Sequence, residues 1–200
     1  RGAILSLAEC HALERIEHLL DRIRLRPADL LDQLSLMRVI QDVKPHEFYN
    51  LAGRSSGAWM FEDPVAIGEL NGLAVARMLE AIRQVDPNIR FCQASSSELF
   101  GEAKESPQSE TTAFQPRSPY GAAKLYAHWM VDIYRKHHGL FACSAVLFNH
   151  ESPRRGLGFV TRKVTDAAAR ISLGLAKSVE LGNLDARRDW GFAGDYMHAM

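Results

Sequence analysis

The 200-residue sequence lacks the features that mark several classes of protein. No apolar run approaches the ~20 residues that a membrane-spanning helix needs, and the N-terminus lacks the layout of a signal peptide. Lysine plus arginine equals aspartate plus glutamate at 24 each, so no global field attracts nucleic acid or a membrane surface. We therefore expect a cytoplasmic globular protein with neither a nucleic acid nor a membrane as partner.

Cysteine and early glycine are also scarce. Cys10, Cys92 and Cys143 are odd in number and lack the Cys/His spacing of a metal site, which indicates reduced thiols and no bound metal. Gly2 is the only glycine before Gly53. The Gly-rich turn with which a dinucleotide-binding fold normally opens is thus missing. We expect either that it precedes the given residues or that it has been lost.

What the sequence does contain is an alternation of apolar runs and amphipathic segments. Its 46% hydrophobic content is enough for a sizeable core, and the alternation predicts one α/β domain. The helix expected from Asp63 has Leu70, Leu73 and Met78 on its apolar face. Expected strands span 47–53, 89–94, 141–148 and 178–182, and expected helices span 3–5, 13–25, 34–43, 119–138 and 160–175, the last with Val164, Ala168 and Ile171 inward.

Tyr120 and Lys124 are four residues apart in the helix that begins at Pro119. Residues at this spacing share one helix face, so phenol and ammonium would project side by side. A nearby ammonium favours the phenolate, and such a tyrosine can take a proton from a sugar or alcohol hydroxyl near neutral pH. The spacing alone is a weak signal, because an ordinary helix with a half-buried tyrosine has the same pattern.

Three serines and an acid, residues 95–98, follow the expected strand 89–94. In open α/β sheets ligands bind at the carboxyl ends of strands. A serine-rich turn with a solvated Glu98 is the alternative. Against it stands the combination of strand-end hydroxyls and acid with a Tyr/Lys pair some twenty residues later.

Strand-end Ser/Glu followed by Tyr-x-x-x-Lys resembles the extended short-chain dehydrogenase/reductase family. Longer runs resemble its GDP-mannose 4,6-dehydratases, densely from about Leu34 onward. This resemblance implies a doubly wound parallel sheet of the Rossmann type, with residues 1–150 as an incomplete NADP-binding domain and 151–200 as the start of a smaller substrate-binding region. The runs that carry it are residues 94–101, 117–126, 147–156, 159–163 and 181–190.

The resemblance also implies an internal redox dehydration of GDP-mannose with NADP. Tyr120 would remove the C4 hydroxyl proton while the C4 hydride passes to the cofactor, and Lys124 would keep the phenol acidic. Glu98 would take the C5 proton before water leaves from C6. Ser96, which stands where the family has threonine, would hydrogen-bond the C4 oxygen.

Binding residues are implied in the same way, together with a homo-oligomer (dimer or tetramer). Asp29 and Leu30 resemble the family's Asp-Leu pair that contacts the adenine end of the cofactor, but an ordinary helix N-terminus explains them equally well. The cofactor-binding set is Asp29, Leu30, Leu51, Ala52, Gly53, Arg54, Ser55, Tyr120, Lys124, His150 and Arg155. The substrate-binding set is Ser96, Glu98, Asn149, Lys163 and Arg188.

Two positions depart from the family pattern. Arg54 stands where a neutral glutamine is usual, and Ala66 where a cofactor-contacting tyrosine is usual. With the missing Gly-rich turn, they leave two alternatives open: another nucleotide-sugar reductase or epimerase of the same fold, and a non-catalytic paralogue with a decayed cofactor site. Glu98 favours the dehydratase, because elimination needs a base at C5.

Overall fold

A computed structural model describes residues 3–5, 14–54, 61 and 63–200 and divides them into two compact units. The first contains the described residues up to Val146, and the second contains residues 147–200. The first unit holds a two-stranded and a three-stranded sheet, and the second holds a two-stranded sheet. Adjacent strands run parallel in each of them, as expected for an α/β fold.

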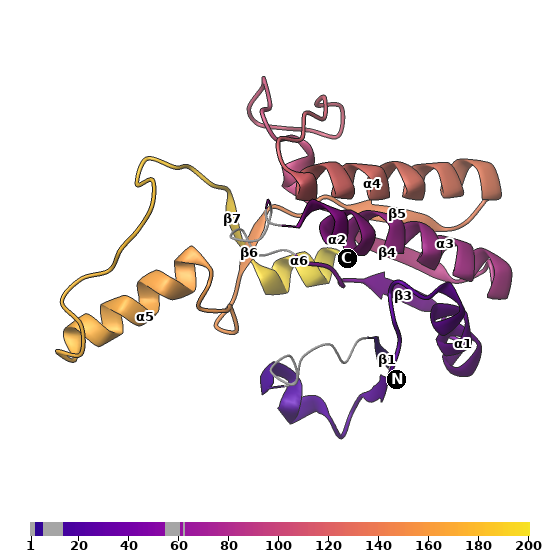
Figure 1. The fold of residues 1–200 in the computed structure, drawn as a ribbon, viewed down its shortest axis with the longest axis horizontal. Helices are drawn as coiled ribbons and strands as arrows, with labels where there is room; N and C mark the ends of the chain where they lie inside the picture. Colours follow the sequence, from indigo (N-terminus) through magenta and orange to yellow (C-terminus); the bar gives the residue numbers. More distant parts are fainter. Residues whose placement is uncertain (1–2, 6–13, 55–60, 62) are drawn as a thin grey trace. The chain divides into compact units, whose positions relative to one another are not determined.

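The three-stranded sheet forms the centre of the first unit (Figure 1). Phe48 and Phe91 are register partners whose rings lie 5.7 Å apart, and Phe91 is fully buried. Parallel strands need long crossover connections, and helices supply them here. The strands, in spatial order, are β3 (Glu47–Asn50), β4 (Arg90–Ala94) and β5 (Ala142–Ala145).

Three helices pack with this sheet around one core: α1 (Gln33–Val43), α3 (Ala74–Val85) and α4 (Pro119–His138). Their buried side chains recur three and four residues apart, as in amphipathic helices. Each helix thus turns one apolar stripe toward the sheet. The buried members are Leu36 and Ile40 of α1, Val75, Met78, Leu79 and Ile82 of α3, and Ala127 and Val131 of α4.

The helix that leads into α3 contains a π-helical turn, η4 (Glu69–Leu73), between α2 (Pro64–Gly68) and α3. The wider turn rotates the side chains by roughly the 100° of one residue relative to an unbroken α-helix. Leu73 is 41% exposed as a result, so its predicted place on the apolar face is wrong. Asn71 and Gly72 are buried instead.

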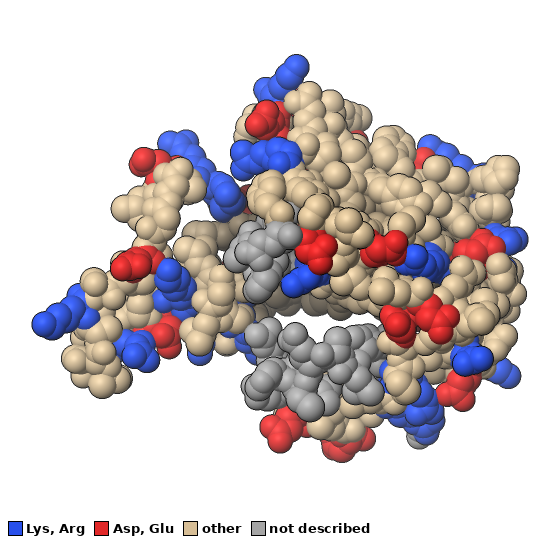
Figure 2. Space-filling model, in the orientation of Figure 1, with Lys and Arg blue, Asp and Glu red and all other residues tan. Residues whose placement is uncertain are grey.

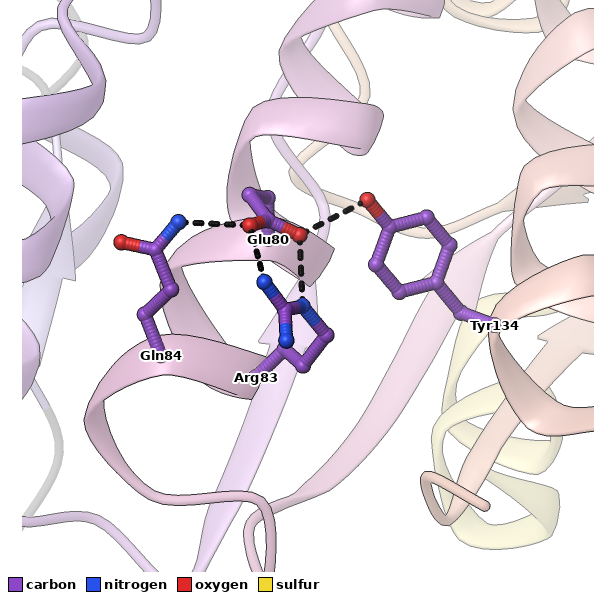
Figure 3. Close-up of polar contacts among 4 residues, drawn as sticks. All are labelled: Glu80, Arg83, Gln84 and Tyr134. Atoms are coloured by element: carbon purple, nitrogen blue, oxygen red, sulfur yellow. Dashed lines mark hydrogen bonds and ion pairs between the residues drawn. The ribbon is translucent and has the colours of Figure 1, made fainter. Parts of the chain in front are cut away.

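Glu80 of α3 holds α3 and α4 together (Figure 3). Its carboxylate accepts two hydrogen bonds from Arg83, at 2.8 and 2.7 Å, and one from Gln84 at 2.5 Å. The phenol of Tyr134, on α4, donates to it at 3.0 Å. These donors, Arg83 first, lower the pKa of Glu80 to about 2.

The N-terminal residues form strands where helix was predicted. β1 (Ala3–Leu5) pairs in parallel with β2 (Arg24–Arg26), and the 3-10 helix η2 (Glu14–Leu19) lies between them in the chain. The predicted helix over 3–5 is therefore wrong, whereas the predicted helix over 13–25 is correct for the residues of η2 and wrong for residues 24 and 25, which lie in β2. Backbone pairing between distant segments outweighs a weak local helical pattern. Cys10 lies outside the described residues.

The second unit also differs from the expected elements. β5 ends at Ala145, and residues 149 and 150 belong to a new strand, β6 (Asn149–Glu151), which the helix α5 (Val160–Ser172) follows. Residues 178–182 form no strand, since the strand that pairs with β6 lies at 190–192. Val164, Ala168 and Ile171 are exposed rather than inward, and Ala167 is the buried residue of α5. The elements are β6 (Asn149–Glu151), α5 (Val160–Ser172), β7 (Trp190–Phe192) and α6 (Ala193–Ala199).

The distribution of charged side chains on the surface agrees with the equal numbers of basic and acidic residues in the sequence. Basic and acidic side chains are interspersed on the visible face of the first unit (Figure 2). Over the described ranges, every helix is too short or too polar to cross a bilayer. Cys92 and Cys143 are free thiols, and the described residues hold no cluster of three or more metal-ligating side chains.

Candidate active site

The carboxyl end of β4 presents a hydroxyl and an acid. β4 ends at Ala94, and Ser96 caps the short helix η5 (Ser97–Leu99) by accepting a hydrogen bond from the Glu98 N–H at 3.2 Å. η5 packs tightly on the start of α4, because a Cβ at Gly121 would lie 2.7 Å from the Glu98 carbonyl oxygen. Glycine at 121 therefore lets the turn that carries Glu98 approach α4.

The first turns of α4 carry the tyrosine and the lysine. Ser118 caps the helix by accepting from the Gly121 N–H at 3.0 Å, and Pro119 occupies the first turn, where a missing N–H costs nothing. Tyr120 and Lys124 are 9% and 5% exposed, and the lysine Nζ lies 5.7 Å from the centroid of the phenol ring. The prediction that they share one helix face is confirmed.

The Lys124 ammonium is held by the backbone of β4. Nζ donates a hydrogen bond to the Ala94 carbonyl oxygen at 2.9 Å. Burial disfavours the charged form and lowers the pKa of Lys124 to about 8. The lysine is thus a cation whose charge is sensitive to mildly alkaline pH.

Tyr120 behaves differently from the sequence expectation. Its pKa is raised, first by burial, and the negative charge of Glu98 adds to the effect, whereas a hydrogen bond with Ser96 acts in the opposite direction. The expected net lowering of this pKa is therefore wrong, because the effect of burial dominates. Ser96 and Glu98 thus both act on the pKa of the Tyr120 phenol.

The turn after β3 faces the same lysine. Gly53 has a φ of +154°, and a Cβ there would lie 2.4 Å from Asn71 Oδ1 and 3.9 Å from Lys124 Nζ. Asn71 clamps the turn: its Oδ1 accepts from the Arg54 N–H at 3.1 Å, and its Nδ2 donates to the Arg54 carbonyl at 3.2 Å. Leu51 is exposed and Ala52 half-buried, while Ser55 lies outside the described residues.

Asp29 and Leu30 have separate surroundings. Leu30 packs in the core, whereas Asp29 is exposed and accepts a hydrogen bond from the Leu31 N–H at 2.9 Å. Asp32, rather than Asp29, caps α1. Asp29 borders a pocket of about 430 Å³, whose other lining residues are Pro27, Ala28, Ser35, Arg38 and Val39.

Three buried amides at the site were missed by the sequence reasoning: Asn50, Asn71 and Gln93. Each interrupts an apolar or helical run with a side chain that must find partners when buried. That interruption is the signal that could have identified them. Asn71 stands between Leu70 and Gly72, for example, in a helix whose neighbouring residues are apolar.

The remaining predicted residues belong to the second unit. Asn149 and His150 lie in β6, and His150 faces Tyr196 with ring centroids 5.2 Å apart. Arg155 lies over the Phe159 ring and pairs with Glu151 at 3.1 Å. Lys163, in α5, and Arg188, in the chain before β7, are exposed.

Solved structures place this geometry in a known class. RMD from Pseudomonas aeruginosa, complexed with NADPH, superposes with a TM-score of 0.81 at 26% identity, covering 98% of this chain and 69% of that one. A dTDP-glucose 4,6-dehydratase from Bacillus anthracis shares the fold with a TM-score of 0.83 at 19% identity, covering 98% and 60%. The chain has the Rossmann-type fold of the extended short-chain dehydrogenases/reductases. The family model described as GDP-mannose 4,6 dehydratase matches residues 3–200, and the chain belongs to that family.

Individual relatives agree with the family model. A GDP-mannose 4,6-dehydratase from Sinorhizobium fredii is 50% identical over 196 residues, covering 94% of this chain and 56% of that protein. An Arabidopsis thaliana relative, GDP-mannose 4,6 dehydratase 2, is 52% identical over 182 residues, covering 89% and 48%. The human GDP-mannose 4,6 dehydratase is 47% identical over 185 residues, covering 92% and 50%. The chain thus spans about half the length of these relatives.

Proposed function

We propose that the protein is an NADP-dependent GDP-mannose 4,6-dehydratase, which converts GDP-mannose to GDP-4-keto-6-deoxymannose and water. The observation that carries this proposal is the packing of the turn with Ser96 and Glu98 against the start of the helix that presents Tyr120 and the buried Lys124. The relatives that bear this name, at about half identity, support the substrate and the reaction.

The residues of the first unit fit a nicotinamide cofactor. Gly53 leaves the room that a Cβ would fill, next to the lysine Nζ, and Asn71 keeps the Arg54 backbone in place. Leu51 to Ser55, Tyr120 and Lys124 would hold the nicotinamide end, and Asp29 and Leu30 the adenine end. The family resemblance adds His150 and Arg155 to the proposed cofactor-binding residues. The NADPH of the Pseudomonas aeruginosa structure supports NADP as the cofactor. When bound, NADP⁺ supplies the acceptor that stores the C4 hydride until its return to C6.

Proton transfer at C4 falls to Tyr120. The Ser96 hydroxyl, which acts to lower the pKa of the phenol, would hydrogen-bond the C4 oxygen and orient the sugar hydroxyl toward the phenolic oxygen. Burial holds the proton on Tyr120 at rest, so the base form needs a cation. Below about pH 8, Lys124 is that cation, and its charge, 5.7 Å from the ring centroid, favours the phenolate as the C4 proton is transferred.

Glu98 would take the C5 proton, which the 4-keto group makes acidic, so that water can leave from C6. Its backbone lies against the first turns of α4, which carry Tyr120, so one sugar ring could reach both residues. Asn149, Lys163 and Arg188 would bind the sugar nucleotide. A 4-reductase or epimerase needs no base at C5, which is why Glu98 favours dehydration.

The test uses the full chain with GDP-mannose and NADP⁺. We expect the wild-type protein to form the 4-keto-6-deoxy product and to exchange the C5 hydrogen with deuterated water. Glu98→Gln should lose both activities while still reducing NADP⁺ in a single turnover. Glu102→Gln, an exposed neighbour in the following loop, should retain them.

Two results would contradict the proposal. Undiminished product from Glu98→Gln would remove Glu98 from the role of C5 base. Absence of NADP⁺ binding in calorimetry would favour a non-catalytic paralogue. Arg54 and Ala66 would then be signs of a decayed cofactor site.

A homo-oligomer in the cytoplasm completes the proposal. Tyr126, Trp129 and Ile133 are exposed on α4 at spacings of three and four residues, which supports burial of this face in a dimer or tetramer. Sedimentation of wild-type protein and of Trp129→Glu tests it, with a smaller species expected for the variant. The free thiols Cys92 and Cys143 support a reducing compartment.

A further inference from the structure

Two amide side chains, Asn50 and Gln93, are bonded to each other inside the first unit. They are register partners on β3 and β4, 2% and 0% exposed, and Asn50 Nδ2 donates to Gln93 Oε1 at 2.7 Å. Apolar side chains of similar size would fill the same space without the cost of burying amides. Their presence therefore calls for a role beyond filling the core.

The other end of each amide reaches the candidate site. Asn50 Oδ1 accepts from the Ala52 N–H at 3.1 Å, within the turn proposed to hold the cofactor. Gln93 Nε2 donates to the Ala94 carbonyl at 2.7 Å, and the same oxygen accepts from Lys124 Nζ at 2.9 Å. Four hydrogen bonds thus run without interruption from the turn to the lysine.

The backbone sets the orientation of both amides. Asn50 must present its oxygen to the Ala52 N–H, which leaves its NH₂ group for Gln93. Gln93 must then accept with its oxygen and present its NH₂ group to the Ala94 carbonyl. Because a donor stands at one end and an acceptor at the other, flipping either amide would break two bonds.

We infer that Gln93, bridged to the cofactor turn through Asn50, is a positioning residue for Lys124. It acts by holding the Ala94 carbonyl and by sharing that oxygen with the ammonium. This inference rests on the proposed function for the catalytic role of Lys124. The bridge, which is the Asn50–Gln93 pair and its hydrogen bonds, is present in the protein without cofactor. As a consequence, a shift of the turn after β3 should change the position of Lys124, and a shift of Lys124 should change the turn.

Sharing one acceptor has a predictable electrostatic effect. The Gln93 N–H competes with the ammonium for the Ala94 oxygen, so its removal should favour charged Lys124 and raise the pKa of the lysine above its present value of about 8. Among the described residues, Lys124 also faces the Tyr120 ring and the Gly53 turn, and Glu98 acts on the Tyr120 phenol. None of these groups changes when Gln93 is replaced.

The first experiment measures the pKa of Lys124 by NMR titration of isotope-labelled lysine in the full chain without cofactor. Gln93→Met, similar in length but without hydrogen-bonding groups, should raise this pKa. The control is Ser144→Ala, on the neighbouring strand in register with Gln93 but outside the bridge, and it should leave the pKa unchanged. An unchanged or lowered pKa in folded Gln93→Met would overturn the inference.

The second experiment uses kinetics and tests the bridge as a unit. Gln93→Met and Asn50→Leu should each lower kcat by about tenfold, and the double variant should lose no more than either single one. Losses that multiply to about a hundredfold would mean two independent structural roles. Absence of turnover in wild-type protein would count against the proposed function alone, since the titration still judges the bridge.

Discussion

Replacing Glu80 by glutamine should weaken the protein at neutral pH and remove part of its sensitivity to acid. In the folded state the pKa of Glu80 is about 2, against an ordinary value of 4.5. A group whose folded pKa is depressed stabilises the fold above its unfolded pKa, and this stability is lost as the pH falls through the folded pKa. The Glu80 contribution is thus complete above about pH 4.5 and gone below about pH 2.

The expected magnitude follows from the two pKa values. Their difference corresponds to about 3 kcal/mol. The Glu80 side chain is 24% exposed, so solvent screens part of this, and we expect a loss of about 2 kcal/mol in the free energy of unfolding at pH 7. Glutamine can still accept from Tyr134, which keeps the loss below that of a full truncation.

Urea unfolding of the full chain at several pH values from 2 to 7 measures this effect. The difference between wild type and Glu80→Gln should shrink steadily as the pH falls through the lower part of that range. Glu110→Gln, at an exposed loop position, serves as the charge-matched control and should change little. A difference that stays constant with pH would refute the assignment of the stability to the ionised carboxylate.

Two further predictions concern the site. Because the proposed mechanism needs Lys124 protonated and its pKa is lowered to about 8, kcat should fall as the pH rises through that value. A pH–rate profile that stays flat up to the usual pKa of lysine would contradict this. Gly121→Ala should destabilise the first unit by about 1–3 kcal/mol in urea unfolding, because the new Cβ would lie 2.7 Å from the Glu98 carbonyl. The helical control Gly68→Ala, with no atom within 4 Å of the new Cβ, should be neutral or stabilising, and an equal loss in both variants would argue against the contact.

Local rules were enough to predict the centre of the site. The spacing of Tyr120 and Lys124 places them on one helix face, and the strand-end rule places Ser96 and Glu98 beside them. Both rules depend on residues close in sequence and on the general geometry of parallel sheets. This is why the grouping of these four residues could be predicted from the sequence.

Properties that depend on distant contacts were beyond such rules. The strand at 3–5 exists through its pairing with 24–26, and the raised pKa of Tyr120 reflects burial by several elements. The amide bridge joins residues 43 positions apart. No local pattern encodes these, because each arises only when separate segments meet.

The wide turn at residues 69–73 lets the helix from 64 to 85 pack against two different clusters of side chains. The extra residue rotates the side chains of one half of the helix relative to those of the other half. As a result, Ile67 packs with Tyr120 and Ala123, while Met78 and Leu79 pack in the main core. A one-residue deletion there would restore regular winding and keep the core, yet swing the Asn71 amide away from the Arg54 backbone. A single genetic event of this kind would separate the ability to fold from the ability to retain a cofactor.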